Sequence, residues 1–163
     1  MGLFHSLVVR SLHAIPKPIL RKLSDRYIAG DTLEEAVAKA QALQARGFRT
    51  ILDVLGEDTE TQEEALHAVD DYQRAVEAAA RNGLQTYVSI KPTQFGLRRS
   101  PADTEKNYRA VLDLARDAKI FTRVEMEDHT TTDGTIALFA ALRRDYADVG
   151  IVIQAYLRRT LQD

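Results

Sequence analysis

The sequence Tyr87-Val88-Ser89-Ile90-Lys91 decides the interpretation of the fold. Val88 and Ile90 are β-branched and suit a buried strand, and the run has an ordinary strand length. It closes on Lys91, and an ammonium group is almost never buried without a partner. We therefore expect a short buried strand whose closing lysine is paired with other polar groups.

Three other stretches share this design, in which an apolar run closes on a polar residue. They are Thr50-Ile51-Leu52-Asp53, Phe121-Thr122-Arg123-Val124-Glu125 and Gly150-Ile151-Val152-Ile153-Gln154. One helix-like segment lies between each consecutive pair, which is the repetition expected of βαβ units. Because ligands bind at the carboxyl ends of parallel strands, we expect the four closing residues to converge on one site. These residues are Asp53, Lys91, Glu125 and Gln154.

Capping signals mark the helices between these runs. Asp31 and Thr32 are followed three residues later by Glu34 and Glu35, and Thr61 is followed by Glu64, as in a capping box. The second of these helices has an apolar stripe, predicted to be buried, made of Leu66, Val69, Tyr72, Val76 and Ala79.

The later helices have their own start signals. Ser100-Pro101 combines an N-cap serine with proline at the first helical position. Several caps between Thr130 and Asp133 predict a last helix that runs to about Tyr146.

The pattern predicts an α/β fold of the (β/α)₈ TIM-barrel family. Parallel strands are expected near residues 50–54, 86–91, 121–126 and 150–155. A complete barrel needs about 250 residues, so four strand–helix units correspond to a partial barrel. Residues 1–30 are expected to form an N-terminal helical segment and residues 31–163 the single barrel domain. The alternative is a small open parallel sheet of four strands that is complete in itself.

Composition limits the classes of function. The 163 residues suffice for one domain with its own core. The net charge of −2 argues against a nucleic-acid-binding protein. The absence of cysteine excludes thiolate nucleophiles, disulfides and Cys-based zinc sites. The sequence contains no apolar run of about 18 residues that would predict a membrane span.

Three chemistries are open at the strand ends. Lys91 could form a Schiff base, as in barrel aldolases, if its pKa were depressed. Glu125, Glu127, Asp128 and His129 could bind a divalent metal. Alternatively, the polar residues could hold an organic cofactor and an acid substrate. Glu125 and Glu127 would share a face if the strand extended that far, because side chains two apart on a strand point the same way.

Five stretches together resemble a known family. They are Tyr27-Ile28-Ala29-Gly30-Asp31-Thr32, Ile51-Leu52-Asp53-Val54-Leu55-Gly56-Glu57, Val88-Ser89-Ile90-Lys91, Val124-Glu125-Met126-Glu127-Asp128 and Gly150-Ile151-Val152-Ile153-Gln154-Ala155-Tyr156-Leu157-Arg158-Arg159-Thr160. They run in the family's order and cover most of the chain. In this combination the chain resembles the FAD-dependent proline dehydrogenases of the monofunctional bacterial type.

The resemblance implies oxidation of L-proline to 1-pyrroline-5-carboxylate in proline catabolism, with hydride transfer to FAD and electrons passing on to a membrane quinone. It places Lys91 at the substrate carboxylate and Glu125 beside flavin and substrate as the catalytic positions. Met126 and Gln154 match flavin-contacting positions, and Asp53 and Glu57 match acidic residues at the substrate end. We expect that no metal is required. The implied location is cytoplasmic, either free or peripheral at the inner face of the membrane.

The chain departs from the family pattern in two ways. Glu125 stands where the family usually has aspartate. The second half of the pattern, with its paired arginines for the proline carboxylate, is absent from these 163 residues. We therefore expect an amino-terminal half that is inactive alone and that pairs with a second half-barrel chain or with another copy. The alternatives are a Schiff-base aldolase using Lys91 and a non-catalytic half-barrel interaction module.

Overall fold

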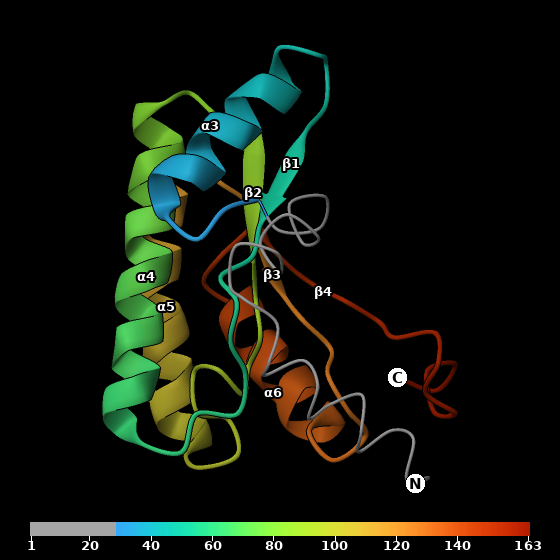
Figure 1. The fold of residues 1–163 in the computed structure, drawn as a ribbon. Coiled ribbons are helices and arrows are strands. Elements are labelled where there is room, and N and C mark those ends of the chain that lie inside the picture. Colours follow the sequence, from blue (N-terminus) through green and yellow to red (C-terminus); the bar gives the residue numbers. More distant parts are fainter. Residues whose placement is uncertain (1–28) are drawn as a thin grey trace, which may run out of the picture. The chain divides into compact units, whose positions relative to one another are not determined.

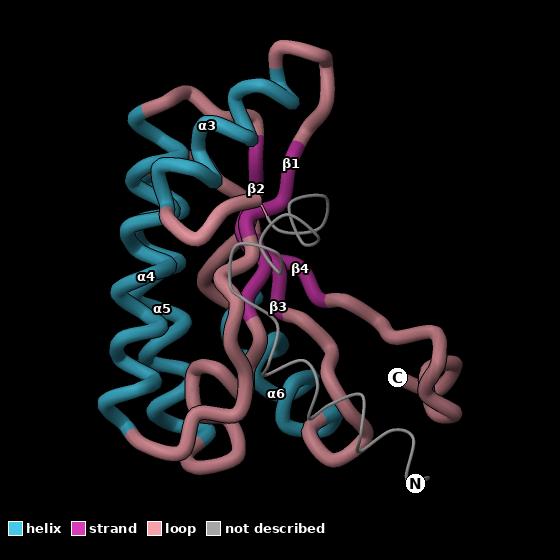
Figure 2. Tube along the Cα trace, in the orientation of Figure 1, coloured by secondary structure: helices cyan, strands magenta, loops and turns pink. Residues whose placement is uncertain are grey.

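The computed structural model describes residues 29–163, so the helical segment expected before them lies outside the described residues. These residues fall into two compact units that divide between Lys39 and Ala40. The predicted domain boundary near residue 30 stays a prediction. In chain order the elements are α3 (Leu33–Gln44), β1 (Thr50–Leu52), α4 (Gln62–Arg81), β2 (Thr86–Ile90), α5 (Pro101–Asp117), β3 (Thr122–Val124), α6 (Thr132–Arg143) and β4 (Val149–Ile151) (Figures 1 and 2).

The four strands form one parallel sheet in the order β1-β2-β3-β4. Val88 of β2 pairs with Leu52 of β1 and with Thr122 of β3, and Thr122 pairs in turn with Val149 of β4. The prediction of an α/β partial barrel is confirmed. The strands are shorter than expected, because β1 ends at Leu52 and β3 ends at Val124. Asp53 and Glu125 therefore follow their strands instead of closing them from within.

One face of the sheet is covered by α4 and α5, which lie side by side (Figure 1). The strand residues Val88, Ile90 and Val124 are fully buried. Behind them the ring of Phe95 makes edge-on contacts with Tyr72 of α4 and Tyr108 of α5, at centroid distances of 5.5 and 5.0 Å. Burial of this apolar layer is the main stabilising term of the fold.

The predicted caps are present at three of the helices. The hydroxyl of Thr32 accepts from the Glu35 N–H at 3.2 Å. Thr61 and Glu64 form a complete capping box at α4, and Ser100 accepts from the Asp103 N–H at the start of α5. Each interaction satisfies an N–H group that the helix itself leaves unpaired.

Three details of the helices differ from the prediction. Leu66 is 49% exposed, because the buried stripe of α4 runs through Ala65, Val69 and Tyr72 and the next residue is rotated about 100° away from it. Helix α6 ends at Arg143, short of Tyr146, and its N-cap Thr131 makes no side-chain cap.

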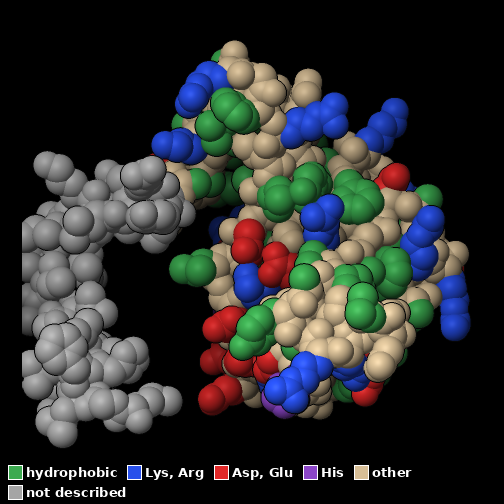
Figure 3. Space-filling view, turned by 90° about the vertical axis from the view of Figure 1, so that its right-hand side faces the viewer, with side chains coloured by type: hydrophobic (Ala, Val, Ile, Leu, Met, Phe, Trp, Pro, Cys, Tyr) green, Lys and Arg blue, Asp and Glu red, His purple; other side chains and the backbone are tan. Residues whose placement is uncertain are grey.

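The outer strands leave apolar side chains exposed. Ile51 in β1 is 50% exposed, and Ile153, just after β4, is 46% exposed. Leu55, in the segment after β1, and Tyr156, in the segment after β4, are almost fully exposed. Figure 3, which views the molecule from the right-hand side of Figure 1, shows exposed hydrophobic side chains beside acidic and basic ones. The two outer strands are thus less completely covered than β2 and β3.

Candidate functional site

Lys91 directly follows β2 and lies between two carboxylates. Its Nζ is 3.1 Å from Asp53 Oδ2 and 3.2 Å from Asp53 Oδ1, and it is 3.6 Å from Glu125 Oε2. The three residues follow three adjacent parallel strands, so the sheet itself brings them together. Three of the four strand-end residues predicted to converge therefore do so. We call Asp53, Lys91 and Glu125 the charged trio.

The charges of the trio keep the lysine protonated. Burial by itself lowers the pKa of Lys91, whose side chain is only 19% exposed, but the hydrogen bond and charge of Asp53 and the charge of Glu125 outweigh this effect. The net result is a pKa above the ordinary value of 10.5. A Schiff-base lysine needs the opposite shift, since only the neutral amine is a nucleophile. The geometry therefore favours an ionic role for Lys91.

Glu125 is held by the neighbouring strand β2. The hydroxyl of Ser89 donates to Glu125 Oε1 at 2.6 Å, and the Glu125 N–H donates to the carbonyl oxygen of Ile90 at 3.0 Å. One carboxylate oxygen is thus fixed by Ser89 while the other is turned to Lys91. Ser89 is buried, and the sequence alone offered no reason to single it out.

Glu127 does not join the charged trio. Because β3 ends at Val124, the alternation of strand side chains does not carry through to this residue. Its carboxylate instead accepts from the N–H of Thr93 at 2.9 Å and from the Thr93 hydroxyl at 2.6 Å. Burial raises the pKa of Glu127 above 4.5, although the two bonds from Thr93 act against this shift. The condition for a shared face of Glu125 and Glu127, a strand that extends to Glu127, is therefore not met.

In the described part of the chain, the other predicted site residues form no side-chain hydrogen bond or ion pair with the trio. Met126 is buried, Gln154 is half-buried and Glu57 is exposed. The backbone carbonyl of Gln154 accepts from the Leu157 N–H at 3.1 Å, which turns the chain after β4. Within residues 29–163, no hydrogen bond links the side chains of Gln154 or Glu57 to Lys91.

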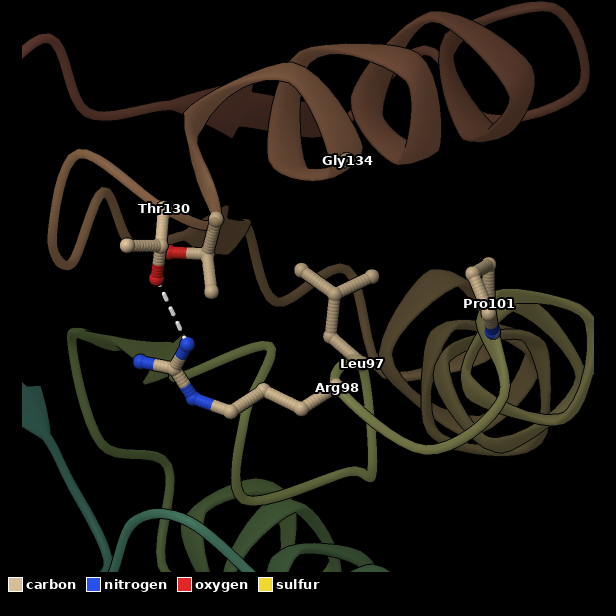
Figure 4. Close-up of a pocket in the computed structure, with 6 residues that line it drawn as sticks. Leu97, Arg98, Pro101, Thr130 and Gly134 are labelled. Atoms are coloured by element: carbon tan, nitrogen blue, oxygen red, sulfur yellow. Dashed lines mark hydrogen bonds between the residues drawn. The ribbon is translucent and has the colours of Figure 1, made fainter.

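Arg98 makes a second set of links at the same end of the sheet. Its guanidinium donates to Asp58 Oδ1 at 2.7 Å, to Asp128 Oδ2 at 2.5 Å and to the Thr130 hydroxyl at 2.6 Å. One arginine of the β2–α5 loop thereby joins the loops that follow β1 and β3. Beside it is a pocket of about 320 Å³, lined by Leu97, Arg98, Pro101, Thr130, Thr131 and Gly134 (Figure 4).

The geometry does not support the metal alternative. Asp128 faces Arg98 and its own loop, where bonds from Thr130 hold its pKa well below the usual range. The carboxylate of Glu127 already accepts hydrogen bonds from Thr93. In the described part of the chain, no three side chains of the His, Cys, Asp and Glu types are arranged to hold a metal ion.

Comparison with known proteins identifies similar chains. The family model described as proline dehydrogenase matches residues 36–163. Proline dehydrogenase 1 of Bacillus subtilis (strain 168) is 31% identical over 138 residues, which are 85% of this chain and 46% of that protein. Proline dehydrogenase of Deinococcus radiodurans is 34% identical over 146 residues, which cover 86% of this chain and 47% of that protein. The chain thus spans about half the length of these curated relatives.

A solved structure has a similar fold. The structure of proline utilization A from Bdellovibrio bacteriovorus superposes with a TM-score of 0.78 over 87% of this chain and 18% of that chain. The sequence identity is 23%, so this likeness supports the arrangement of strands and helices only.

Proposed function

We propose that this chain, which belongs to the proline dehydrogenase family, forms one side of a site that oxidises L-proline to 1-pyrroline-5-carboxylate with hydride transfer to FAD. The observation that carries the proposal is the position of Lys91, paired with Asp53 and Glu125 at the carboxyl ends of adjacent parallel strands. Ligands bind at this end of barrel sheets.

The charges of the trio suit an amino acid better than a simple acid. One ammonium group between two carboxylates has a net negative charge, so a ligand with both signs is better matched than a lone carboxylate. In our proposal Lys91 binds the carboxylate of L-proline. Asp53 and Glu57 then lie at the substrate end, and Glu125 lies beside the substrate and the flavin. Ser89 keeps Glu125 turned toward Lys91.

The residues proposed to meet FAD fit it in part. FAD supplies the hydride acceptor when it is bound. The side-chain amide of Gln154 is half-buried and suits a hydrogen bond to the polar edge of a ring, and Glu125 retains some exposed surface. Met126 is 7% exposed, so it offers little of its side chain. We therefore assign Gln154 and Glu125 as the main contacts from this chain.

We further propose that a second half-barrel completes the site. The exposed Ile51 and Ile153 at the outer strands support this, because another strand pair there would cover them. A single lysine is also a poor substitute for bidentate arginines in holding a carboxylate. Residues 1–163 alone are then inactive, and the second half-barrel supplies the side chains that complete the site.

The route of the electrons is also a proposal. The family resemblance supports a quinone acceptor and a cytoplasmic protein that is free or peripheral at the inner face of the membrane. Among residues 29–163, no helix has the length and apolar character needed to cross a bilayer.

The substitution Lys91→Ala tests the function. We expect it to weaken L-proline binding by about 1.5–3 kcal/mol, or roughly ten- to hundredfold in KM, because a charge-assisted contact is lost. The measurement is steady-state oxidation of L-proline by the chain combined with a separately expressed carboxyl-terminal half of a relative. Lys106→Ala, at a surface position of α5, is the matched control. An unchanged KM in Lys91→Ala would remove Lys91 from the substrate site.

A further inference from the structure

Two tyrosines from consecutive helices bind adjacent backbone groups of β2. The hydroxyl of Tyr72, on α4, donates to the carbonyl oxygen of Ser89 at 2.7 Å. The hydroxyl of Tyr108, on α5, donates to the carbonyl oxygen of Ile90 at 2.7 Å. Both side chains are fully buried. These two carbonyl groups immediately precede Lys91.

The same hydroxyls reach the neighbouring strands. The oxygen of Tyr72 accepts from the Val54 N–H at 3.2 Å and lies 3.2 Å from Asp53 Oδ1, so it joins the end of β1 to β2. The carbonyl of Ile90, which accepts from Tyr108, also accepts the N–H of Glu125 at the end of β3. Each tyrosine thus acts at the junction that sets one carboxylate against Lys91.

The aromatic packing leaves these rings little freedom. Phe95 lies between Tyr72 and Tyr108 and contacts both rings edge-on. A buried hydroxyl without a partner costs free energy. Neither tyrosine can therefore leave its carbonyl without that cost while its ring stays in the core. This combination is more than core packing requires, since phenylalanine would fill the same space.

We propose that Tyr72 and Tyr108 are positioning residues that hold the carboxyl end of β2 so that Asp53 and Glu125 stay in register with Lys91. The inference rests on the proposed function only for what the charged trio binds. The positioning itself is a property of the chain without flavin or proline.

The test measures how strongly Lys91 is held by its counter-charges. The groups that face it are Asp53 and Glu125, with Glu127 acting at longer range. Trace acetylation with acetic anhydride, read by mass spectrometry across mildly alkaline pH, reports the neutral fraction of each lysine. In the 163-residue chain, Lys91 should be acetylated about three- to tenfold faster in the Tyr72→Phe variant than in the wild type. This increase is expected when a close carboxylate is held less firmly beside the lysine. Tyr108→Phe should show a smaller increase.

Two references separate positioning from general loosening. Tyr146→Phe removes a buried hydroxyl whose 2.9 Å bond goes to Asp113, away from the trio, and should leave Lys91 unchanged. Lys106, which is exposed in the folded chain, is the internal reference for reagent dose in every variant, and a thermal unfolding curve shows which variants are folded. Asp53→Asn marks the rate after direct loss of the counter-charge. If Tyr72→Phe does not fold, Tyr108→Phe decides the outcome. Equal Lys91 rates in the wild type and the folded tyrosine variants would overturn the proposal, whatever their melting temperatures. Because no turnover is measured, that result is distinct from failure of the proposed function.

Discussion

The carboxyl ends of β2 and β4 arise from the same sequence pattern but differ in how completely they are enclosed. At β2, Ile90 is fully buried and the carbonyls of Ser89 and Ile90 each accept from a tyrosine hydroxyl. At β4, Ile153 is 46% exposed and Gln154 makes no side-chain bond to the charged trio.

The difference follows from the neighbours of each strand. Among the strands of residues 29–163, β2 pairs on both sides, whereas β4 pairs with β3 alone. An apolar run that closes on a polar residue therefore predicts a strand and its end, but the surrounding strands determine whether that end becomes an organised site. In this chain the organised part is the charged trio, and the β4 end remains open.

The largest expected effect on stability is the contrast between isoleucine-to-alanine substitutions at the carboxyl ends of β2 and β4. Ile90→Ala should lower the free energy of unfolding by about 2–5 kcal/mol, since it leaves a cavity in a closed core. Ile153→Ala should cost less than about 1 kcal/mol, because the side chain is already half in water. Urea unfolding of both variants measures the contrast. Similar losses would mean that the β4 end is as well packed as the β2 end.

Removal of the central charge should have the next largest effect. Lys91→Met leaves Asp53 and Glu125 facing each other without a cation, and we expect a loss of about 1–2 kcal/mol after allowance for partial exposure. Lys106→Met, where the side chain is 77% exposed, should change stability by less than about 0.5 kcal/mol. The comparison is made by thermal unfolding near neutral pH. If Lys91→Met left the stability unchanged, the pairing would add nothing to the stability of the β2 end.

The helices that lead into the two strands should also differ. Thr61→Ala removes the capping box of α4, before β2, and should cost about 1 kcal/mol. Thr131→Ala, at the start of α6 before β4, should cost less, because its side chain does not cap the helix. Denaturant midpoints test the order of the two losses, and a larger loss in Thr131→Ala would reverse the comparison.

The smallest effect concerns pH and Glu127. Since its pKa in the folded chain is raised above 4.5, the folded state holds this proton more tightly than the unfolded state. Its contribution to stability therefore falls as pH rises from about 4.5 through the folded pKa. Glu127→Gln should gain stability relative to the wild type over that interval, whereas Glu77→Gln, on the exposed side of α4, should not. Parallel stability–pH curves for Glu127→Gln and the wild type would contradict the prediction.

The local parts of the structure could be predicted from the sequence. Caps such as Thr61 with Glu64 act within one turn, and the meeting of Asp53, Lys91 and Glu125 follows from parallel strands alone. The bonds of Arg98 to Asp58 and Asp128 were not predicted, since loop conformation selects among many acidic partners.

The positions that were missed share a physical cause. Ser89 and Tyr72 look like ordinary strand and core residues until the sheet places them beside Glu125 and Asp53. The shared face of Glu125 and Glu127 depended on a strand that extends beyond Val124, and side-chain alternation no longer applies after β3 ends there.

The most direct measurement of the central claim is anaerobic reduction of FAD by L-proline. The loss of visible flavin absorbance reports this reduction. We predict no reduction with the 163-residue chain alone and reduction when the carboxyl-terminal half of a relative is added. When that half is combined with the Lys91→Ala variant of the 163-residue chain, we predict little reduction at the same L-proline concentration. Reduction by the chain alone, or equal reduction by the Lys91→Ala chain, would contradict the account of a half-built site centred on Lys91.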